Sequence, residues 1–110
     1  MATIIPFRPI TRVKDMLERL GQELSHAYED LAFPNHNAFL LQMGERGRDI
    51  FLYFNQESEP KDRSPILLSV KSAGAALGLK VRYHGTYRMT QLEGEEVEIS
   101  FDPDTPLTFD

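Results

Sequence analysis

The run RDIFLYFN, residues 48–55, decides the fold. Its central residues, from Ile50 to Phe54, are all apolar or aromatic, so a strand built from them presents apolar side chains on both faces. A strand of this kind belongs in the middle of a sheet, because both of its faces need to be covered. If helices cover only one face, the other face needs a cover of its own.

A second β-prone run, HNAFLLQM at 36–43, precedes this strand. The four residues between them, GERG at 44–47, include two glycines, which adopt the positive φ of a tight reversal at little cost. The two runs therefore predict an antiparallel hairpin.

The clearest helical pattern lies before the hairpin. Apolar side chains recur at three-four spacing from Val13 to Leu31, with Thr11 as a candidate N-cap and Pro34 just beyond the end. This spacing predicts an amphipathic helix over residues 12–31.

A second helix is expected after the hairpin. Ser64 followed by Pro65 is typical of a helix start, since the hydroxyl can cap free amides and proline is tolerated in the first turn. Gly78 supplies the left-handed residue that often ends a helix. We expect this helix over residues 65–77.

The run KVRYHGTYRM, residues 80–89, alternates polar and apolar side chains, which predicts a half-buried strand. The return strand lies within QLEGEEVEISFD, residues 91–102. A three-residue loop at 92–94 would place Arg88 opposite Glu98 and His84 opposite Asp102, so opposite charges would neutralise much of the basic side. The same register would set apolar residues opposite each other, in the pairs Met89 with Val97 and Tyr87 with Ile99.

These elements predict an α+β fold in a single domain spanning 1–110. We expect a two-layer sandwich with both helices on one face of a four- or five-stranded, mostly antiparallel sheet, in the order (β)-α-β-β-α-β-β. Residues 1–10, which contain two prolines, are expected to form an extended arm or edge strand. Residues 55–63 read as a mobile loop and residues 103–110 as an acidic tail.

Composition excludes several classes of protein. The 110 residues contain no cysteine, so disulfides, thiolate metal sites and cysteine nucleophiles are ruled out. The first residues, MATIIPFRPI, lack a basic start and are interrupted by Pro6, so no signal peptide is expected. No run approaches the roughly 20 apolar residues of a membrane helix. We expect a soluble cytoplasmic protein with no membrane partner.

The sequence carries only weak motifs for catalysis, metal binding or phosphate binding. Glu23 and His26 form a single E-x-x-H, whereas di-iron bundles use this motif in pairs, and His36 lies between two asparagines in an expected turn. The run KSAGAALG, residues 71–78, lacks the pattern of a phosphate-binding loop. We therefore expect no catalytic residues, no metal and no cofactor.

The leading interpretation is a small non-enzymatic binding or regulatory protein that acts through a protein interface, as a homodimer or as a subunit. The apolar central strand and one apolar residue on the exposed side of the second helix motivate it. The interface candidates are Phe51, Tyr53 and Leu68.

The alternative is weak nucleic-acid binding by the basic strip around residues 71–88, with a small hydrolase as a third possibility. A net charge of −5 and the acidic residues that follow position 92 count against nucleic acid. The strip comprises Lys71, Lys80, Arg82, Tyr83, His84, Tyr87 and Arg88.

Overall fold

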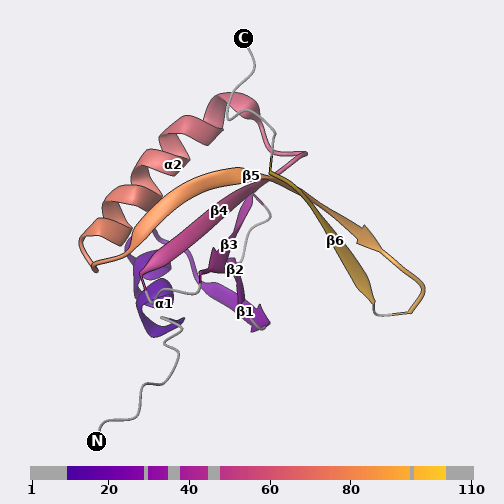
Figure 1. Ribbon diagram of the computed structural model, residues 1–110, viewed down its shortest axis with the longest axis horizontal. Helices are drawn as coiled ribbons and strands as arrows, with labels where there is room; N and C mark the ends of the chain where they lie inside the picture. Colours follow the sequence, from indigo (N-terminus) through magenta and orange to yellow (C-terminus); the bar gives the residue numbers. More distant parts are fainter. Residues whose placement is uncertain (1–9, 29, 35–37, 45–47, 95, 104–110) are drawn as a thin grey trace, which may run out of the picture.

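Two helices lie on one face of a six-stranded sheet (Figure 1). The computed structural model describes residues 10–28, 30–34, 38–44, 48–94 and 96–103. The helices are α1 (Ile10–Arg19) and α2 (Pro60–Ala75). The strands are β1 (Leu24–Tyr28), β2 (Leu31–Pro34), β3 (Phe39–Met43), β4 (Asp49–Asn55), β5 (Lys80–Gln91) and β6 (Val97–Asp102).

The strands lie in the sheet in their sequence order, β1 to β6. Strands β1 to β4 form an antiparallel meander, which includes the expected β3–β4 hairpin. Strand β5 then pairs with β4 in parallel, and α2 supplies the crossover that a parallel pair requires. Strand β6 returns antiparallel to β5. The sheet is therefore mixed.

The α+β class and the two helices are confirmed, but the four- or five-stranded, mostly antiparallel sandwich is wrong. The sheet has six strands and a parallel pair at its centre. The two additional strands are β1, which lies within the second half of the expected first helix, and β2, which begins at its last residue, Leu31.

The first helix ends at Arg19 because Gly21 stops it. Gly21 has φ 76°, and its N–H donates to the carbonyl of Glu18 at 3.0 Å. The N–H of Gln22 donates to the carbonyl of Leu17 at 2.8 Å, which completes a Schellman motif. The apolar residues beyond this point keep a helical spacing but belong to strands, so the helix predicted over 12–31 is wrong.

The second helix starts at Pro60 rather than at residue 65, so residues 60–63 of the expected loop are helical. Pro60 occupies the first turn, where proline is tolerated. The buried side chain of Arg63 holds this start in place, because its Nη2 donates to the carbonyls of Asn55, Gln56 and Ser58. No described residue accepts a hydrogen bond from its Nη1. Gly78 has the expected left-handed conformation after the helix.

The main core lies between the helices and the sheet. Val13, Met16 and Leu17 of α1 and Leu67 and Val70 of α2 are buried there against alternate residues of the strands. A smaller cluster lies on the opposite face, which we call the outer face. Its buried members are Leu40, Tyr53 and Tyr87.

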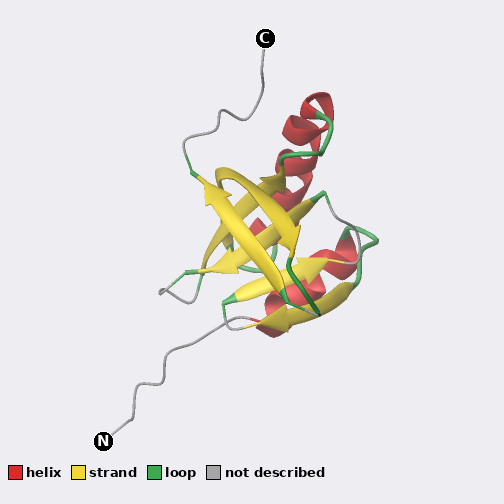
Figure 2. Cartoon of the chain, turned by 90° about the vertical axis from the view of Figure 1, so that its right-hand side faces the viewer, coloured by secondary structure: helices red, strands yellow, loops and turns green. Residues whose placement is uncertain are grey.

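A β-bulge interrupts β5 at His84. Leu52 and Tyr53 are consecutive in β4, but they pair with Tyr83 and Gly85, so His84 is an extra residue. The bulge changes which side chains face the helices, because Val81 and Tyr83 lie on the helix side whereas Tyr87 lies on the outer face. In Figure 2, where the far end of the β5–β6 ribbon points toward the reader, these two strands cross in front of the remaining sheet.

The β5–β6 register differs by two residues from the predicted one. Arg88 pairs with Ser100, and Glu98 pairs with Thr90. Gln91 and Val97 form the last pair, so the connection is longer than the expected three residues. Within the described residues no ion pair joins Arg88 to Glu98, and the predicted charge neutralisation at this position is wrong.

Several expectations fall on residues outside the described ranges. These are residues 1–9 of the expected N-terminal extended segment, most of the acidic tail at 103–110, and His36. Neither helix in the described part of the chain is both long enough and apolar enough to cross a bilayer.

Gly85→Ala tests the importance of the bulge. A Cβ at this position would overlap the carbonyl oxygen of Asp102 and lie 2.6 Å from Cα of Pro103, in a backbone with φ 138°. We expect a loss of about 2–5 kcal/mol in the free energy of unfolding, measured by urea denaturation. Gly21→Ala is the control, because it also has positive φ but no atom within 4 Å of the added Cβ, and should cost only about 1 kcal/mol. Equal losses would show that the close approach at Gly85 is unimportant.

Candidate functional site

The outer face carries most of the polar and aromatic side chains that could act together. Strand alternation places residues of β2 to β6 on it, since their sequence neighbours belong to the helix-side core. Its described residues include Leu31, Phe33, Leu40, Gln42, Phe51, Tyr53, Arg82, His84, Tyr87, Ile99 and Phe101.

The chain covers the centre of this face itself. Tyr53 is only 5% exposed, and its ring centroid lies 4.5 Å from that of Phe101 in β6. Phe51 is half-buried against His84, at a centroid separation of 4.8 Å. Of the interface candidates from the sequence, Tyr53 is therefore inaccessible and Phe51 only partly accessible. Leu68, on α2, is 68% exposed and lies on the other side of the molecule.

A chain of hydrogen bonds crosses the outer face. Gln42 Nε2 donates to Asp30 Oδ2 at 3.0 Å, which leaves Gln42 Oε1 to accept from the hydroxyl of Tyr53 at 3.2 Å. The hydroxyl of Tyr53 also lies 2.6 Å from Nδ1 of His84. The donor in this last bond depends on the tautomer of His84, since either the hydroxyl or Nδ1–H can supply the proton. In both cases the bond holds the orientation of the imidazole.

This arrangement positions an exposed imidazole and keeps Tyr53 neutral. Burial raises the pKa of Tyr53, and the negative charge of Asp30 raises this pKa further. No second titratable side chain among the described residues makes a hydrogen bond to His84. The geometry thus links β3, β4 and β5 through hydrogen-bonded side chains, but among the described residues it does not assemble a pair of groups for acid–base chemistry.

The bulge divides the basic strip. Lys80, Arg82 and His84 lie on the outer face, whereas Arg88 follows the bulge and points to the opposite side of the ribbon. The two tyrosines of the strip are not free for stacking, because Tyr83 packs against the helix-side core and Tyr87 is buried. Lys71 is exposed on α2, away from this strand. The seven residues do not form one surface.

The feature that the sequence did not reveal is a projecting ribbon. We call residues 88–94 and 96–100 the arm. The last pair between β4 and β5 joins Asn55 to Tyr87, so beyond this point β5 has β6 as its sole neighbour in the described sheet. Met89 and Val97, whose alternation predicted burial, are 46% and 49% exposed. A glycine in the middle of a strand, Gly85, was the available sign of a bulge.

Metal binding finds no support in the described residues. They contain no group of three or more His, Asp or Glu side chains placed to hold an ion. The side chain of His26, which the E-x-x-H motif would use, lies outside the part of the structure that is described.

Alkaline titration tests the environment of Tyr53. Burial raises the pKa values of Tyr53, Tyr83 and Tyr87, so above the unfolded-state pKa of about 10 the folded state holds more protons than the unfolded state. The resulting stability is fully present below about pH 10 and is lost as the pH rises further. We expect the urea midpoint to fall between pH 9.5 and 11, as estimated from the reference pKa of about 10, and to fall less in Tyr53→Phe. An identical decrease in the two proteins would contradict this assignment.

Comparison of the chain with protein families, curated proteins and solved structures finds no match. What the protein does has to be inferred from its own side chains and surfaces.

Proposed function

We propose that this chain is a non-enzymatic binding protein that works through protein contacts made by the arm, and that its first partner is a second copy of itself. The observation that carries the proposal is the exposed apolar face of the arm. Met89, Val97 and Leu92, at the turn, are 46%, 49% and 43% exposed, and Phe101 at the base is 39% exposed.

The arm needs a partner for a physical reason. A two-stranded ribbon is marginally stable in water unless a third strand or another layer supports it. Beyond Tyr87, neither a third strand nor another layer of the described sheet supports the ribbon, which there consists of the pairs Met89 with Ile99 and Gln91 with Val97. Contact with another surface would bury the apolar face that these pairs share.

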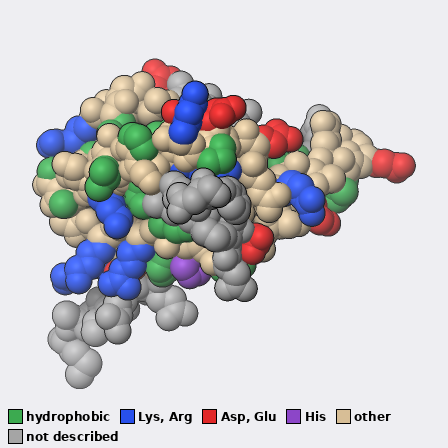
Figure 3. All heavy atoms as spheres, turned by 90° about the horizontal axis from the view of Figure 1, so that it is seen from above, with side chains coloured by type: hydrophobic (Ala, Val, Ile, Leu, Met, Phe, Trp, Pro, Cys, Tyr) green, Lys and Arg blue, Asp and Glu red, His purple; other side chains and the backbone are tan. Residues whose placement is uncertain are grey.

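Charge distribution favours a second copy as that surface. The segment from Glu93 to Asp102 contains acidic residues and no basic ones, whereas Lys80 and Arg82 lie on the outer face of the body. Figure 3 shows acidic side chains along the projecting ribbon and at its tip, with a basic side chain among them, and most of the visible basic side chains on the body. In a two-fold dimer the arm of each copy would lie across the outer face of the other, with the acidic turn residues Glu93 and Glu96 near Lys80 and Arg82. Glu98 and Asp102 alternate with the apolar residues of β6 and would face away from this contact.

Nucleic-acid binding has no comparable support. The basic residues of the predicted strip lie on different surfaces, and the acidic arm extends from the same strand. The acidic residues of this arm would repel a phosphate backbone, and because this repulsion is electrostatic it would be strongest at low salt.

Val97→Asp tests the arm contact. We expect the wild-type protein to sediment at micromolar concentration as a dimer, at twice the chain mass of 12.6 kDa. Val97→Asp should sediment as a monomer, because a buried unpaired carboxylate in the contact would cost several kcal/mol.

Thr90→Asp is the matched control, because Thr90 is equally part of the arm but points away from the apolar face. This variant should remain dimeric. A strictly monomeric wild-type protein over the whole micromolar range, or a dimer that both variants leave intact, would rule out the arm as the self-association surface.

A further inference from the structure

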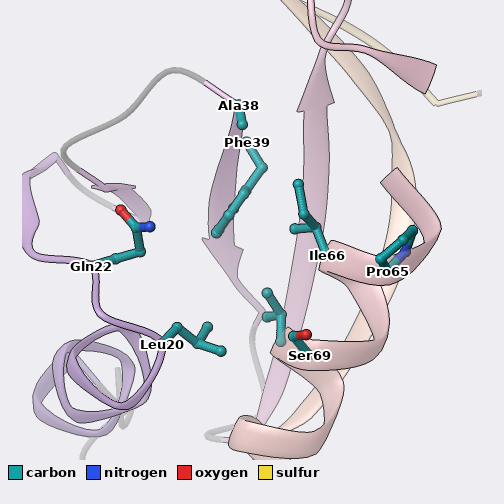
Figure 4. A pocket seen from close by; sticks show the side chains of 8 residues that line it. Leu20, Gln22, Ala38, Phe39, Pro65, Ile66 and Ser69 are labelled. Carbon is teal, nitrogen blue, oxygen red and sulfur yellow. The ribbon is translucent and has the colours of Figure 1, made fainter. Parts of the chain in front are cut away.

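A cavity of about 410 Å³ lies between α1, α2 and the start of β3, on the helix side of the sheet. Figure 4 shows Leu20 and Gln22 on the α1 side, Ile66 and Ser69 on α2, and Phe39 between them. Ala38, Pro65 and Val70 complete the lining, so apolar side chains predominate.

The cavity continues into a shallower groove between the two helices. Leu20 and Ser69 line both spaces. The groove adds the hydroxyl of Ser72, the exposed side chain of Leu68 and the guanidinium of Arg19. One end of the combined site is therefore a mainly apolar hollow, and the other is shallower and carries hydrogen-bond donors and a positive charge.

Neither lining contains a carboxylate. Arg19 also makes no ion pair with any described residue, so its charge is available at the mouth of the groove. An anionic group would meet a cation and two hydroxyl donors there without facing a like charge in the wall.

The apolar hollow favours an apolar occupant. Its lining combines the buried side chains of Phe39 and Val70 with the exposed residues Pro65 and Ser69 at its rim. Water in an apolar space lacks hydrogen-bond partners, so such spaces gain little from filling with water. A volume of about 410 Å³ is within the range of small-molecule pockets, roughly 300–1,000 Å³.

We propose that this site binds an amphiphilic carboxylate, of the medium-chain fatty acid class. The acyl chain lies in the cavity against Phe39, Ile66 and Val70, and the carboxylate lies in the groove beside Arg19 and the serine hydroxyls. A methylene group takes up about the volume of one water in the liquid, roughly 30 Å³, so the cavity accommodates about a dozen carbon atoms. This site is separate from the arm and does not depend on self-association.

The first test is titration calorimetry of the full chain with octanoate, decanoate, dodecanoate and tetradecanoate, below their micelle concentrations. Each added methylene should tighten binding about fourfold while it still enters the cavity. The gain should stop near twelve carbons. Absence of saturable binding for all four acids would overturn the proposal.

The second test separates head-group recognition from apolar burial. Arg19→Gln should weaken decanoate binding about threefold to fivefold, the upper part of the range for an exposed ion pair, and leave decanol binding within about twofold of wild type. Lys71→Gln removes a charge from the same pair of helices outside both linings, and should change neither. Equal binding of decanoate and decanol to all three proteins would exclude a carboxylate ligand.

The third test blocks the junction of cavity and groove. Ser69→Leu places an apolar side chain at an exposed helix position, so the variant should keep the wild-type unfolding midpoint or exceed it while decanoate binding falls at least tenfold. Lys71→Leu is the control for an added exposed leucine and should bind normally. A folded Ser69→Leu protein with wild-type affinity would place the ligand elsewhere. Val97→Asp should also bind decanoate normally, whether or not the arm mediates dimerisation.

Discussion

The β-bulge at His84 is the constraint on which the rest of the structure depends. Strand β5 must pair in parallel with β4 along its first half and antiparallel with β6 along its second half. The extra residue bends the strand, and Gly85 allows the backbone of Asp102 and Pro103 to approach closely. Without this bend β6 would continue away from the sheet. With it, Phe101 packs on Tyr53.

The bend also explains how both faces of the apolar strand at 50–54 are covered. The helices cover one side, where Ile50, Leu52 and Phe54 are fully buried. The other side is covered at its centre by the chain's own ribbon, and the hydroxyl of Tyr53 is satisfied by Gln42 and His84. The strand at 50–54, which first suggested an external apolar partner, is covered at its centre by the chain itself. The exposed apolar face is instead on the arm, where the ribbon leaves the sheet.

Short-range sequence patterns predicted the elements that depend on neighbouring residues alone. The β3–β4 hairpin and the glycine turn at Gly78 follow from turn residues and apolar runs. The segment after Gly21 was misread because strands of four or five residues are too short to show a clear two-residue period, and apolar residues such as Leu24 and Leu31 also fit a helical spacing. The order and direction of strands were not readable, because a parallel pair is made by contacts far apart in the sequence.

The arm could not be found from the sequence for a related reason. Its exposure depends on a difference in length, since β4 has seven residues and β5 has twelve. Alternation shows that Met89 and Val97 share a face, but it does not show whether another strand or layer reaches them. Of the sequence's interface candidates, Leu68 lies in the groove between the helices, and Phe51 lies on the outer face that would receive a partner's arm.

Both proposed surfaces arise where one element ends before its neighbour. Because Gly21 stops α1 after ten residues, α1 does not extend over the space beside Phe39, and the cavity remains between it and α2. Because β4 ends at Asn55, the arm has no third strand beside it in the described sheet. Three packed rings lead from the cavity to β5, since Phe39 and Phe54 have centroids 6.3 Å apart and Phe54 and Tyr83 have centroids 6.0 Å apart.

These packed rings are poorly suited to couple ligand binding in the cavity to contacts made by the arm. Energetic coupling between two sites requires an element with two distinct arrangements, each favoured by one ligand. Phe54, the middle ring, is fully buried in the main core, where close packing disfavours a second arrangement. A ligand in the cavity and a second copy at the arm also occupy opposite faces of the sheet. Binding at the two surfaces should therefore be additive in free energy, which would let one chain respond to a small molecule and to a protein independently.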